Sequence, residues 1–184
     1  MIYILLGSGF EEAEALVTAD VLRRANLPVS LVSVDDSPAV TGSHGITVAA
    51  DRPIMTVVLE DGDTLVLPGG MGGVASMEKS DAAMDLIREA AGHYRLAAIC
   101  AAPTLLARAG LLKQGAQCVC YPGMEGELSA AGAVPRMDRP TVVDGNLITG
   151  RGPGAAFDFG LKLVEVLAGA DAARAVAAGL VYGA

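Results

Sequence analysis

Cys100 lies in an apolar run, residues 96–106, that turns helical just after the cysteine. Ala98 and Ala102 flank it, two residues away on either side. That spacing of small residues is typical of a nucleophile elbow, a sharp strand-to-helix turn with no room for larger side chains. Such a turn puts the sulfur at a helix N-terminus, where free N–H groups favour the thiolate. The competing interpretation is an inert cysteine in a core strand, and the pattern alone favours it because alanines replace the usual glycines.

Glu14 is the second candidate, because its charge conflicts with its position. At 100° per residue along a helix, it lies in a row of apolar residues that belongs in a core. The residues on its side are Phe10, Val17, Val21 and Ala25, and those opposite are Glu12, Leu16, Ala19 and Arg23. Burial without a cationic partner would raise the pKa of the Glu14 carboxyl. Alternatively, an exposed Glu14 in the first turn would complement the helix dipole, and the row alone favours neither interpretation.

Two glycine-rich segments are candidate anion sites. Residues 65–74 combine an apolar strand pattern with Pro-Gly-Gly-Met-Gly-Gly, whose glycines let backbone N–H groups gather round an anion, as an oxyanion hole requires. No lysine follows at the spacing of a Walker loop, and a flexible loop fits the pattern equally well. In residues 149–154, Arg151 is a candidate for binding a carboxylate or phosphate, although loop arginines are mostly solvated.

The remaining residues with metal-binding side chains are two histidines and two cysteines. His44 precedes a glycine in a hairpin pattern, and His93 lies at the polar end of a helix. Cys118 and Cys120 point to one face of a strand, which gives two ligands where a zinc site needs three or four. We therefore expect core packing or surface thiols for this pair, and no metal site.

The composition excludes several classes of partner. The chain of 184 residues, with 13 Lys plus Arg against 21 Asp plus Glu, carries a net charge of -8 and fits one compact domain over residues 1–184. Without a cluster of Lys or Arg, it suits neither nucleic acid nor an anionic membrane. The longest apolar stretch, residues 96–112, contains Pro103 and Arg108 and is too short to span a bilayer. The odd number of cysteines and the lack of a basic leader predict a cytoplasmic location.

The elements that must position these residues alternate between strands and helices. Nearly continuous apolar strand patterns separated by helical ones predict a parallel α/β sheet covered on both faces, a three-layer sandwich. The expected strands are residues 2–6, 29–34, 65–67 and 96–99; the helices are residues 12–25, 81–91 after the N-cap Ser80, 155–167 after Pro153, and about 171–178; the hairpins are residues 40–48 and 142–148, the second with an Asp-Gly turn.

With these segments in hand, the chain resembles the ThiJ/PfpI superfamily, and within it the branch of the parkinsonism-associated deglycase-like protein and bacterial YajL. The resemblance is collinear over essentially the whole chain. Its carriers are residues 9–14, 67–70, 97–103 and 149–159. It implies a flavodoxin-like sandwich that forms a homodimer, with Cys100 as the reactive cysteine and Glu14 as its carboxyl partner. It further implies that the amides of Gly69, Gly70 and Ala101 are donors around the pocket, with Arg151 close by.

Three positions depart from the superfamily. Tyr121 stands where animal members of the branch carry a histidine before proline, and Ala101 stands where protease-like members place a histidine after the nucleophile. The resemblance therefore implies no Cys–His dyad at either position and argues against classical peptide hydrolysis. His44 replaces an arginine that reaches the partner subunit's pocket in close relatives. In a similar dimer it would lie near Cys100 of the other chain, as a candidate general base.

The resemblance leads to three functional hypotheses. The first is a cofactor-independent glyoxalase or deglycase that acts on small reactive dicarbonyls such as methylglyoxal, or on their adducts. The second is a redox-responsive stress protein or chaperone in which Cys100 is oxidised; a protonated Glu14 would donate a hydrogen bond to a thiolate or to a sulfinate oxygen. An amidase or protease-like hydrolase ranks third because of Ala101.

Overall fold

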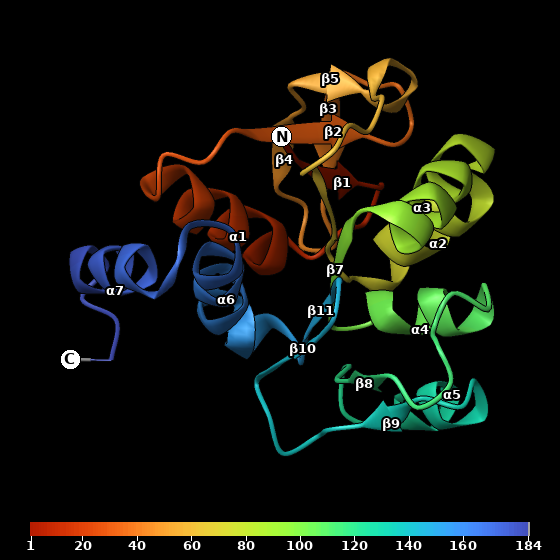
Figure 1. The fold of residues 1–184 in the computed structure, drawn as a ribbon. Coiled ribbons are helices and arrows are strands. Elements are labelled where there is room, and N and C mark those ends of the chain that lie inside the picture. Colours follow the sequence, from red (N-terminus) through yellow and green to blue (C-terminus); the bar gives the residue numbers. More distant parts are fainter. Residues whose placement is uncertain (184) are drawn as a thin grey trace.

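The computed structural model describes residues 1–183 and has a mixed sheet between two layers of helices (Figure 1). Parallel pairing relates all neighbouring strands of this sheet except the antiparallel pair at one edge, so the predicted α/β sandwich with a mostly parallel sheet is confirmed. The seven strands follow the order β10 (Thr141–Asp144), β11 (Leu147–Gly150), β7 (Arg95–Ile99), β6 (Thr64–Leu67), β1 (Ile2–Leu6), β2 (Val29–Ser33) and β5 (Arg52–Pro53).

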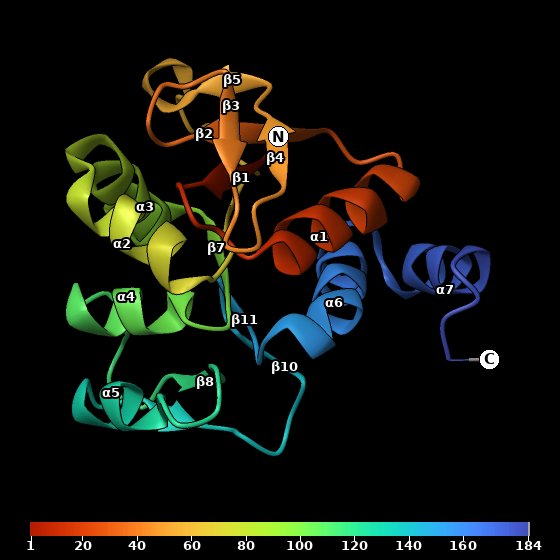
Figure 2. The same cartoon turned by 180° about the vertical axis from the view of Figure 1, so that it is seen from behind.

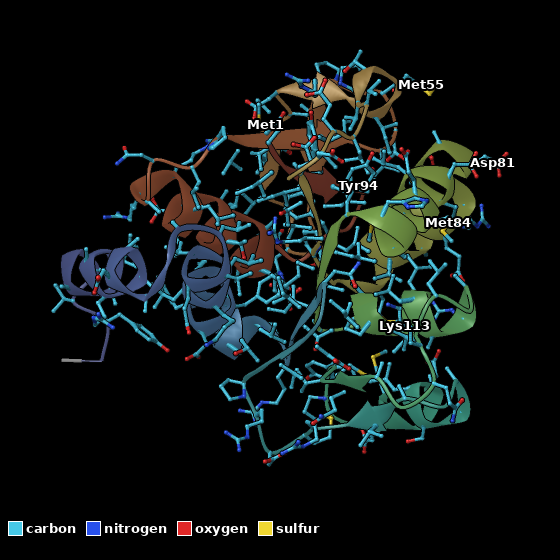
Figure 3. The ribbon with its side chains drawn as sticks, viewed as in Figure 1. Met1, Met55, Asp81, Met84, Tyr94 and Lys113 are labelled. Carbon is cyan, nitrogen blue, oxygen red and sulfur yellow. The ribbon has the colours of Figure 1, made fainter. Side chains whose placement is uncertain are left out.

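Helices cover both faces of the sheet (Figure 1). One layer holds α1 (Glu12–Arg24), α6 (Ala156–Ala168) and α7 (Ala170–Gly179), and the other holds α2 (Met71–Lys79), α3 (Asp81–His93) and α4 (Ala102–Arg108), with α5 (Glu125–Ala130) beyond α4. Every residue of β1 and β6 is buried, which explains their continuous apolar runs. Side chains fill the space between the layers (Figure 3). No helix in the described part of the chain is both long and apolar enough to cross a bilayer.

Local signals set the ends of two helices as expected. The Ser80 hydroxyl accepts a hydrogen bond from the N–H of Ala83 at 3.3 Å and so caps α3. Pro153 opens the short 3₁₀ turn η2 (Pro153–Ala155) that leads into α6. Gly169, with φ 92°, ends α6 in a conformation that only glycine adopts readily.

The helix α2 was not predicted, because glycines at its start suggested a loop. Its glycines serve a close approach: a Cβ on Gly72 would lie 3.0 Å from the Cα of Gly9, and one on Gly73 would lie 2.7 Å from the Cα of Phe10. The first turn of α2 therefore packs directly on the backbone that follows β1. Helix propensity, which disfavours glycine, is overridden here by tertiary packing.

Two hairpins were predicted and both form. The strands β3 (Ala39–Thr41) and β4 (Thr47–Ala49) pair antiparallel, and Figure 2 shows their turn beside the start of α1. In the second hairpin, β10 and β11, Asp144 pairs with Leu147, so Gly145 and Asn146 form the turn rather than the expected Asp-Gly pair. Gly145 is thus the first residue of the two-residue loop, and its φ of 61° is a conformation that glycine adopts readily. The elements η1 (Ile54–Thr56), β9 (Val134–Pro135), β5 and α5 were not predicted. The strand expected at Cys118 and Cys120 is the short β8 (Gln117–Cys118), which ends before Cys120.

The sheet order brings the candidate segments together. The strands β11, β7, β6 and β1 are neighbours and run parallel, so their carboxyl ends lie along one edge of the sheet. Arg151 follows β11, Cys100 follows β7, Gly69 follows β6, and the loop to α1 and Glu14 follows β1. The chain continues from β1 to β2 on one side and returns to β6 on the other, and ligands of open α/β sheets bind at such a reversal.

Candidate active site

Cys100 occupies the turn between β7 and α4, not the strand itself. Its φ of 64° lies in the left-handed region, where residues other than glycine are strained, as in a nucleophile elbow. Its N–H donates to the carbonyl of Gly150 at 2.9 Å, and its carbonyl accepts from the N–H of Tyr121 at 2.8 Å. Backbone contacts on both sides thus hold the strained residue. The side chain is buried, with 8% of the residue exposed.

Glu14 is buried in the first turn of α1, so the exposed alternative is wrong. Only 1% of the residue is accessible to solvent. One carboxyl oxygen, Oε2, accepts a hydrogen bond from the N–H of Gly69 at 2.7 Å. The other, Oε1, has no hydrogen-bond partner among residues 1–183. A buried carboxyl with an open oxygen and no cationic partner is costly to ionise, and it is available to exchange a proton with a ligand.

The rest of the predicted apolar row on α1 is only partly correct. Val17 is half-buried, whereas Glu12, placed on the opposite face, is buried. The turn between β3 and β4 covers Glu12, whose Oε1 accepts from the N–H of His44 at 2.7 Å. Sequence reasoning missed this contact. One signal for it is Gly42, because a Cβ there would lie 2.4 Å from Glu12 Oε1.

Hydrogen bonds keep Glu12 ionised despite its burial. Burial alone would raise its pKa, but the His44 side chain and backbone N–H groups outweigh that effect and lower the pKa to about 2. Glu12 and Glu14 lie in the same turn of α1 and are both buried, yet their pKa values shift in opposite directions. The difference lies in the hydrogen bonds that each carboxylate accepts: Glu12 accepts from the His44 side chain and from several backbone N–H groups, whereas Glu14 accepts from Cys100 and from one backbone N–H.

The backbone amides around the sulfur divide between two acceptors. Gly69 donates its N–H to Glu14, so this amide is already occupied. The N–H groups of Gly70 and Ala101 lie against Cys100 and favour its ionised form. Of the three predicted donors, the last two are thus free to stabilise a negative charge at the sulfur or on an atom bound to it.

The electrostatics of the site differ from the expectation of a simple low-pKa cysteine. Burial raises the pKa of the Cys100 thiol, and the charge and hydrogen bond of Glu14 raise it further, outweighing the amides of Gly70 and Ala101. Burial likewise raises the pKa of Glu14 to about 7 against the opposing hydrogen bonds from Cys100 and Gly69. The site therefore resists holding two negative charges. As the pH rises through about 7 the pair loses the carboxyl proton, while the thiol keeps its own.

The raised pKa of Glu14 predicts a pH-dependent stability. The folded protein binds this proton more tightly than the unfolded chain, so its contribution is full below the usual Glu pKa of 4.5 and is lost as the pH rises through about 7. The Glu14→Gln protein lacks this loss. Relative to it, we expect the wild-type free energy of unfolding to fall by on the order of 3 kcal/mol between pH 4 and pH 8. Urea denaturation of both proteins across this range measures the difference, and a constant difference would contradict the buried-carboxyl assignment.

Gly69 fixes how closely the two reactive groups approach. A Cβ at this position would lie 2.7 Å from the Cβ of Cys100 and 2.8 Å from Glu14 Oε2, so the thiol and the carboxyl face each other across a glycine. We expect Gly69→Ala to lower the free energy of unfolding by about 1–3 kcal/mol through overpacking. The matched control is Gly92→Ala in α3, where a Cβ would meet no atom within 4 Å. Equal stability of the two variants in urea would refute the close approach.

Arg151 lies beside the elbow rather than in contact with the thiol. With Tyr121 and Pro122 it lines a pocket of about 210 Å³, completed by residues 152–155. Its guanidinium approaches the carbonyl of Met137 at 3.5 Å. Because Tyr121 and Gly150 both hydrogen-bond the backbone of Cys100, this pocket adjoins the candidate nucleophile.

The other candidates are arranged as follows. His44 has 69% of its side chain exposed, and its Nδ1 lies 2.9 Å from Glu12 Oε2, which leaves Nε2 directed outward. The contact of His44 with a second chain stays a prediction.

His93 is exposed, as expected. Cys118 and Cys120 are fully buried, which confirms core packing over surface thiols, and burial raises the pKa of their thiols to about 11 and about 12.

Comparison with known proteins shows which family the chain is similar to. The model of the DJ-1/PfpI family matches residues 1–166. Protein dj-1beta of Drosophila melanogaster is 41% identical over 179 residues, covering 96% of this chain and 94% of the relative. The Parkinson disease protein 7 homolog of Danio rerio is 33% identical over 185 residues, covering 97% and 95%.

Solved structures show the same fold. The crystal structure of Drosophila melanogaster DJ-1beta superposes with a TM-score of 0.91 at 38% identity, covering 100% of this chain and 98% of that one. Oxidized Toxoplasma gondii DJ-1 superposes with a TM-score of 0.91 at 34% identity and the same coverage. These matches extend over the sheet, both helical layers and the elbow. The chain is a member of the DJ-1/PfpI family.

Proposed function

We propose that this protein is a glutathione-independent glyoxalase or deglycase that acts on small reactive dicarbonyls such as methylglyoxal, or on their adducts. The observation that carries the proposal is the buried pair of Cys100 and Glu14 at an elbow, in which burial raises the pKa of the carboxyl to about 7. A thiol beside a carboxyl whose pKa lies near the working pH suits a reaction that needs a nucleophile and repeated proton transfer.

The reaction starts with addition of the sulfur to the aldehyde. Glu14 takes the thiol proton as the Cys100 sulfur bonds to the aldehyde carbon, and the carbonyl oxygen receives that proton to give a hemithioacetal. The N–H groups of Gly70 and Ala101 stabilise the negative charge that develops on this oxygen before it is protonated. The open Oε1 of Glu14 provides the acceptor for the next proton.

Proton transfer between carbons completes the conversion. The Glu14 carboxylate removes the hydrogen of the former aldehyde carbon as a proton to give an enediolate, and the same proton is delivered to the neighbouring carbon. The product is a thioester of lactate on Cys100. Water then cleaves the C–S bond, which releases lactate and restores the thiol. The net reaction adds one water to methylglyoxal and needs no redox partner.

The test is lactate formation from methylglyoxal by reduced protein without glutathione. We expect lactate to account for the methylglyoxal consumed, with the Cys100→Ser protein as the background. Running the reaction in D2O adds a second readout, because transfer by one carboxyl predicts that part of the product keeps hydrogen at the new C–H bond. Lactate formation no faster than that of the Cys100→Ser protein would overturn the proposal for this substrate.

Redox sensing is the second candidate, and a specific contact favours it. A sulfinate formed from Cys100 would have an oxygen beside the Glu14 carboxyl, which could donate its proton to that oxygen. A relative in the family, Toxoplasma gondii DJ-1, has a solved structure in an oxidized form. Mass spectrometry after graded peroxide treatment tests this function: it predicts that Cys100 gains two oxygens ahead of Cys118 and Cys120, and that Glu14→Gln slows this gain.

A homodimer is part of the same proposal. The exposed ring of His44 and the exposed Ile46, at 53% accessibility, lie on the turn beside α1 and are available to a second chain. In such a dimer His44 would approach the partner's pocket and assist proton transfer there. Light scattering gives the mass in solution. A monomer, or a His44→Ala protein whose pH profile matches wild type, would remove His44 from the site.

A further inference from the structure

Four side chains converge where the turn between β3 and β4 meets the start of α1. Ser43 Oγ lies 3.1 Å from Glu11 Oε2, 3.1 Å from Glu12 Oε2 and 3.0 Å from His44 Nδ1. His44 Nδ1 lies 2.9 Å from Glu12 Oε2 and 3.7 Å from Glu11 Oε2. The ligand atoms of the two glutamates and the histidine all lie within 4.8 Å of one another. Two carboxylates, an imidazole and a hydroxyl thus face one point.

These separations match the corners of a tetrahedral metal site. In a regular tetrahedron with edges of about 3.3 Å, the centre lies about 2.0 Å from each corner, which is the usual bond length from zinc to histidine nitrogen or carboxylate oxygen. Five of the six edges given by the four atoms lie between 2.9 and 3.7 Å. The ligand oxygens of Glu11 and Glu12 lie within 4.8 Å of each other, so an ion at the centre requires the two carboxylates to close around it.

The charges and hydrogen bonds of the cluster also favour a cation. The hydroxyl of Ser43 has one proton, so it cannot donate to Glu11 and Glu12 at once. With a neutral His44 the two glutamates give the cluster two negative charges. No lysine or arginine in residues 1–183 forms an ion pair with either glutamate. A divalent ion would neutralise the cluster.

A second set of hydrogen bonds orients the ligands. The other oxygen of Glu12, Oε1, accepts from the N–H groups of His44 and Ile46 at 2.7 and 3.4 Å. The N–H of Ser43 donates to the carbonyl of Phe10 at 2.8 Å, which fixes the turn against the residue before Glu11. Buried backbone donors of this kind hold metal-binding carboxylates in place, and Glu12 is only 5% exposed.

We propose that Glu11, Glu12 and His44 form a binding site for a tetrahedrally coordinated divalent transition metal of the zinc type. The imidazole selects against magnesium and calcium, which prefer oxygen ligands in larger numbers. The fourth corner, where Ser43 Oγ stands, takes a neutral oxygen from serine or water. The bound ion ties the β3–β4 turn to α1. Its ligands include neither Cys100 nor Glu14, so the role assigned to the ion is to hold the turn against α1.

The test is a zinc titration of the chelator-treated full-length protein, in competition with a chromophoric chelator. Cys100→Ser serves as the background, because the free thiol also binds zinc. We expect one zinc per chain, and an affinity at least about 10-fold weaker after His44→Ala or after Glu11→Gln, which keeps size and hydrogen bonding but removes charge. X-ray absorption of the complex should show nitrogen and oxygen around zinc without sulfur.

The matched control is His93→Ala. His93 is the other histidine, is exposed at the end of α3, and should leave zinc affinity unchanged. Zinc binding that is absent in the Cys100→Ser background, that is equal in the His44→Ala and His93→Ala proteins, or that includes a sulfur ligand would overturn the proposal. Circular dichroism of each variant establishes that a weaker affinity does not come from unfolding.

Discussion

Replacing Cys100 with serine is expected to lower kcat/KM for methylglyoxal by about 10³-fold or more. The substitution changes one atom, so the backbone contacts from Gly150 and Tyr121 that hold the elbow stay intact. The hydroxyl of serine is far less acidic than a thiol, and neither the amides of Gly70 and Ala101 nor Glu14 supplies enough stabilisation to ionise it. Initial rates of lactate formation measure the effect.

Cys118→Ala is the matched control for this prediction. Cys118 is fully buried in β8, so its removal tests whether loss of any buried thiol affects the rate. We expect kcat/KM to stay at the wild-type value, with a modest loss of stability from the small cavity. Comparable activity of the Cys100→Ser and wild-type proteins would show that the sulfur is not the nucleophile.

Glu14→Gln is expected to lower kcat/KM by about 10²- to 10⁴-fold, the range for loss of a general acid–base group. The amide oxygen of glutamine can still accept the hydrogen bond from Gly69, so the geometry of the loop is kept. What is lost is the group that moves protons. Since the same change should stabilise the folded protein above pH 7, activity and stability are predicted to move in opposite directions at one residue.

The pH profile separates proton transfer from a structural role of Glu14. The carboxyl must be ionised to accept the thiol proton, so kcat/KM of the wild type should rise with pH through about 7. In the Glu14→Gln protein this rise should be absent. The control is Glu127→Gln, which removes an exposed carboxylate that pairs with Arg108 at 2.9 Å. A wild-type profile in Glu14→Gln would show that another group carries the proton.

Much of this arrangement follows from local sequence. The elbow at Cys100 requires small neighbours at fixed spacing, and the buried position of Glu14 agrees with the apolar row on its side of α1, so both features have a local signal. The order of strands then joins segments that are far apart in the chain, because parallel strands end at one edge. The residue pattern alone, however, favoured an inert strand cysteine at position 100 and left the burial of Glu14 open, so the resemblance to the superfamily was needed to predict both.

The burial of Glu12 could not be predicted in this way. It depends on a turn about thirty residues further along the chain, and the helical period alone placed Glu12 on the outer face. The helix α2 was missed for a related reason: its glycines disfavour a helix locally, and only their packing against Gly9 and Phe10 explains them. The raised pKa of Cys100 is likewise a property of the pair, since it arises from burial and from the charge of Glu14.

The last strand of the sheet on one side, β5, limits how the protein can associate. It consists of Arg52 and Pro53 alone, and it pairs with only the end of β2. Proline has no N–H, and two residues present too short a row of free backbone groups for another strand to add. A long regular strand at this position would invite chain-to-chain pairing and fibre growth. The sheet is therefore protected on this side from edge-to-edge aggregation, even when the protein is concentrated.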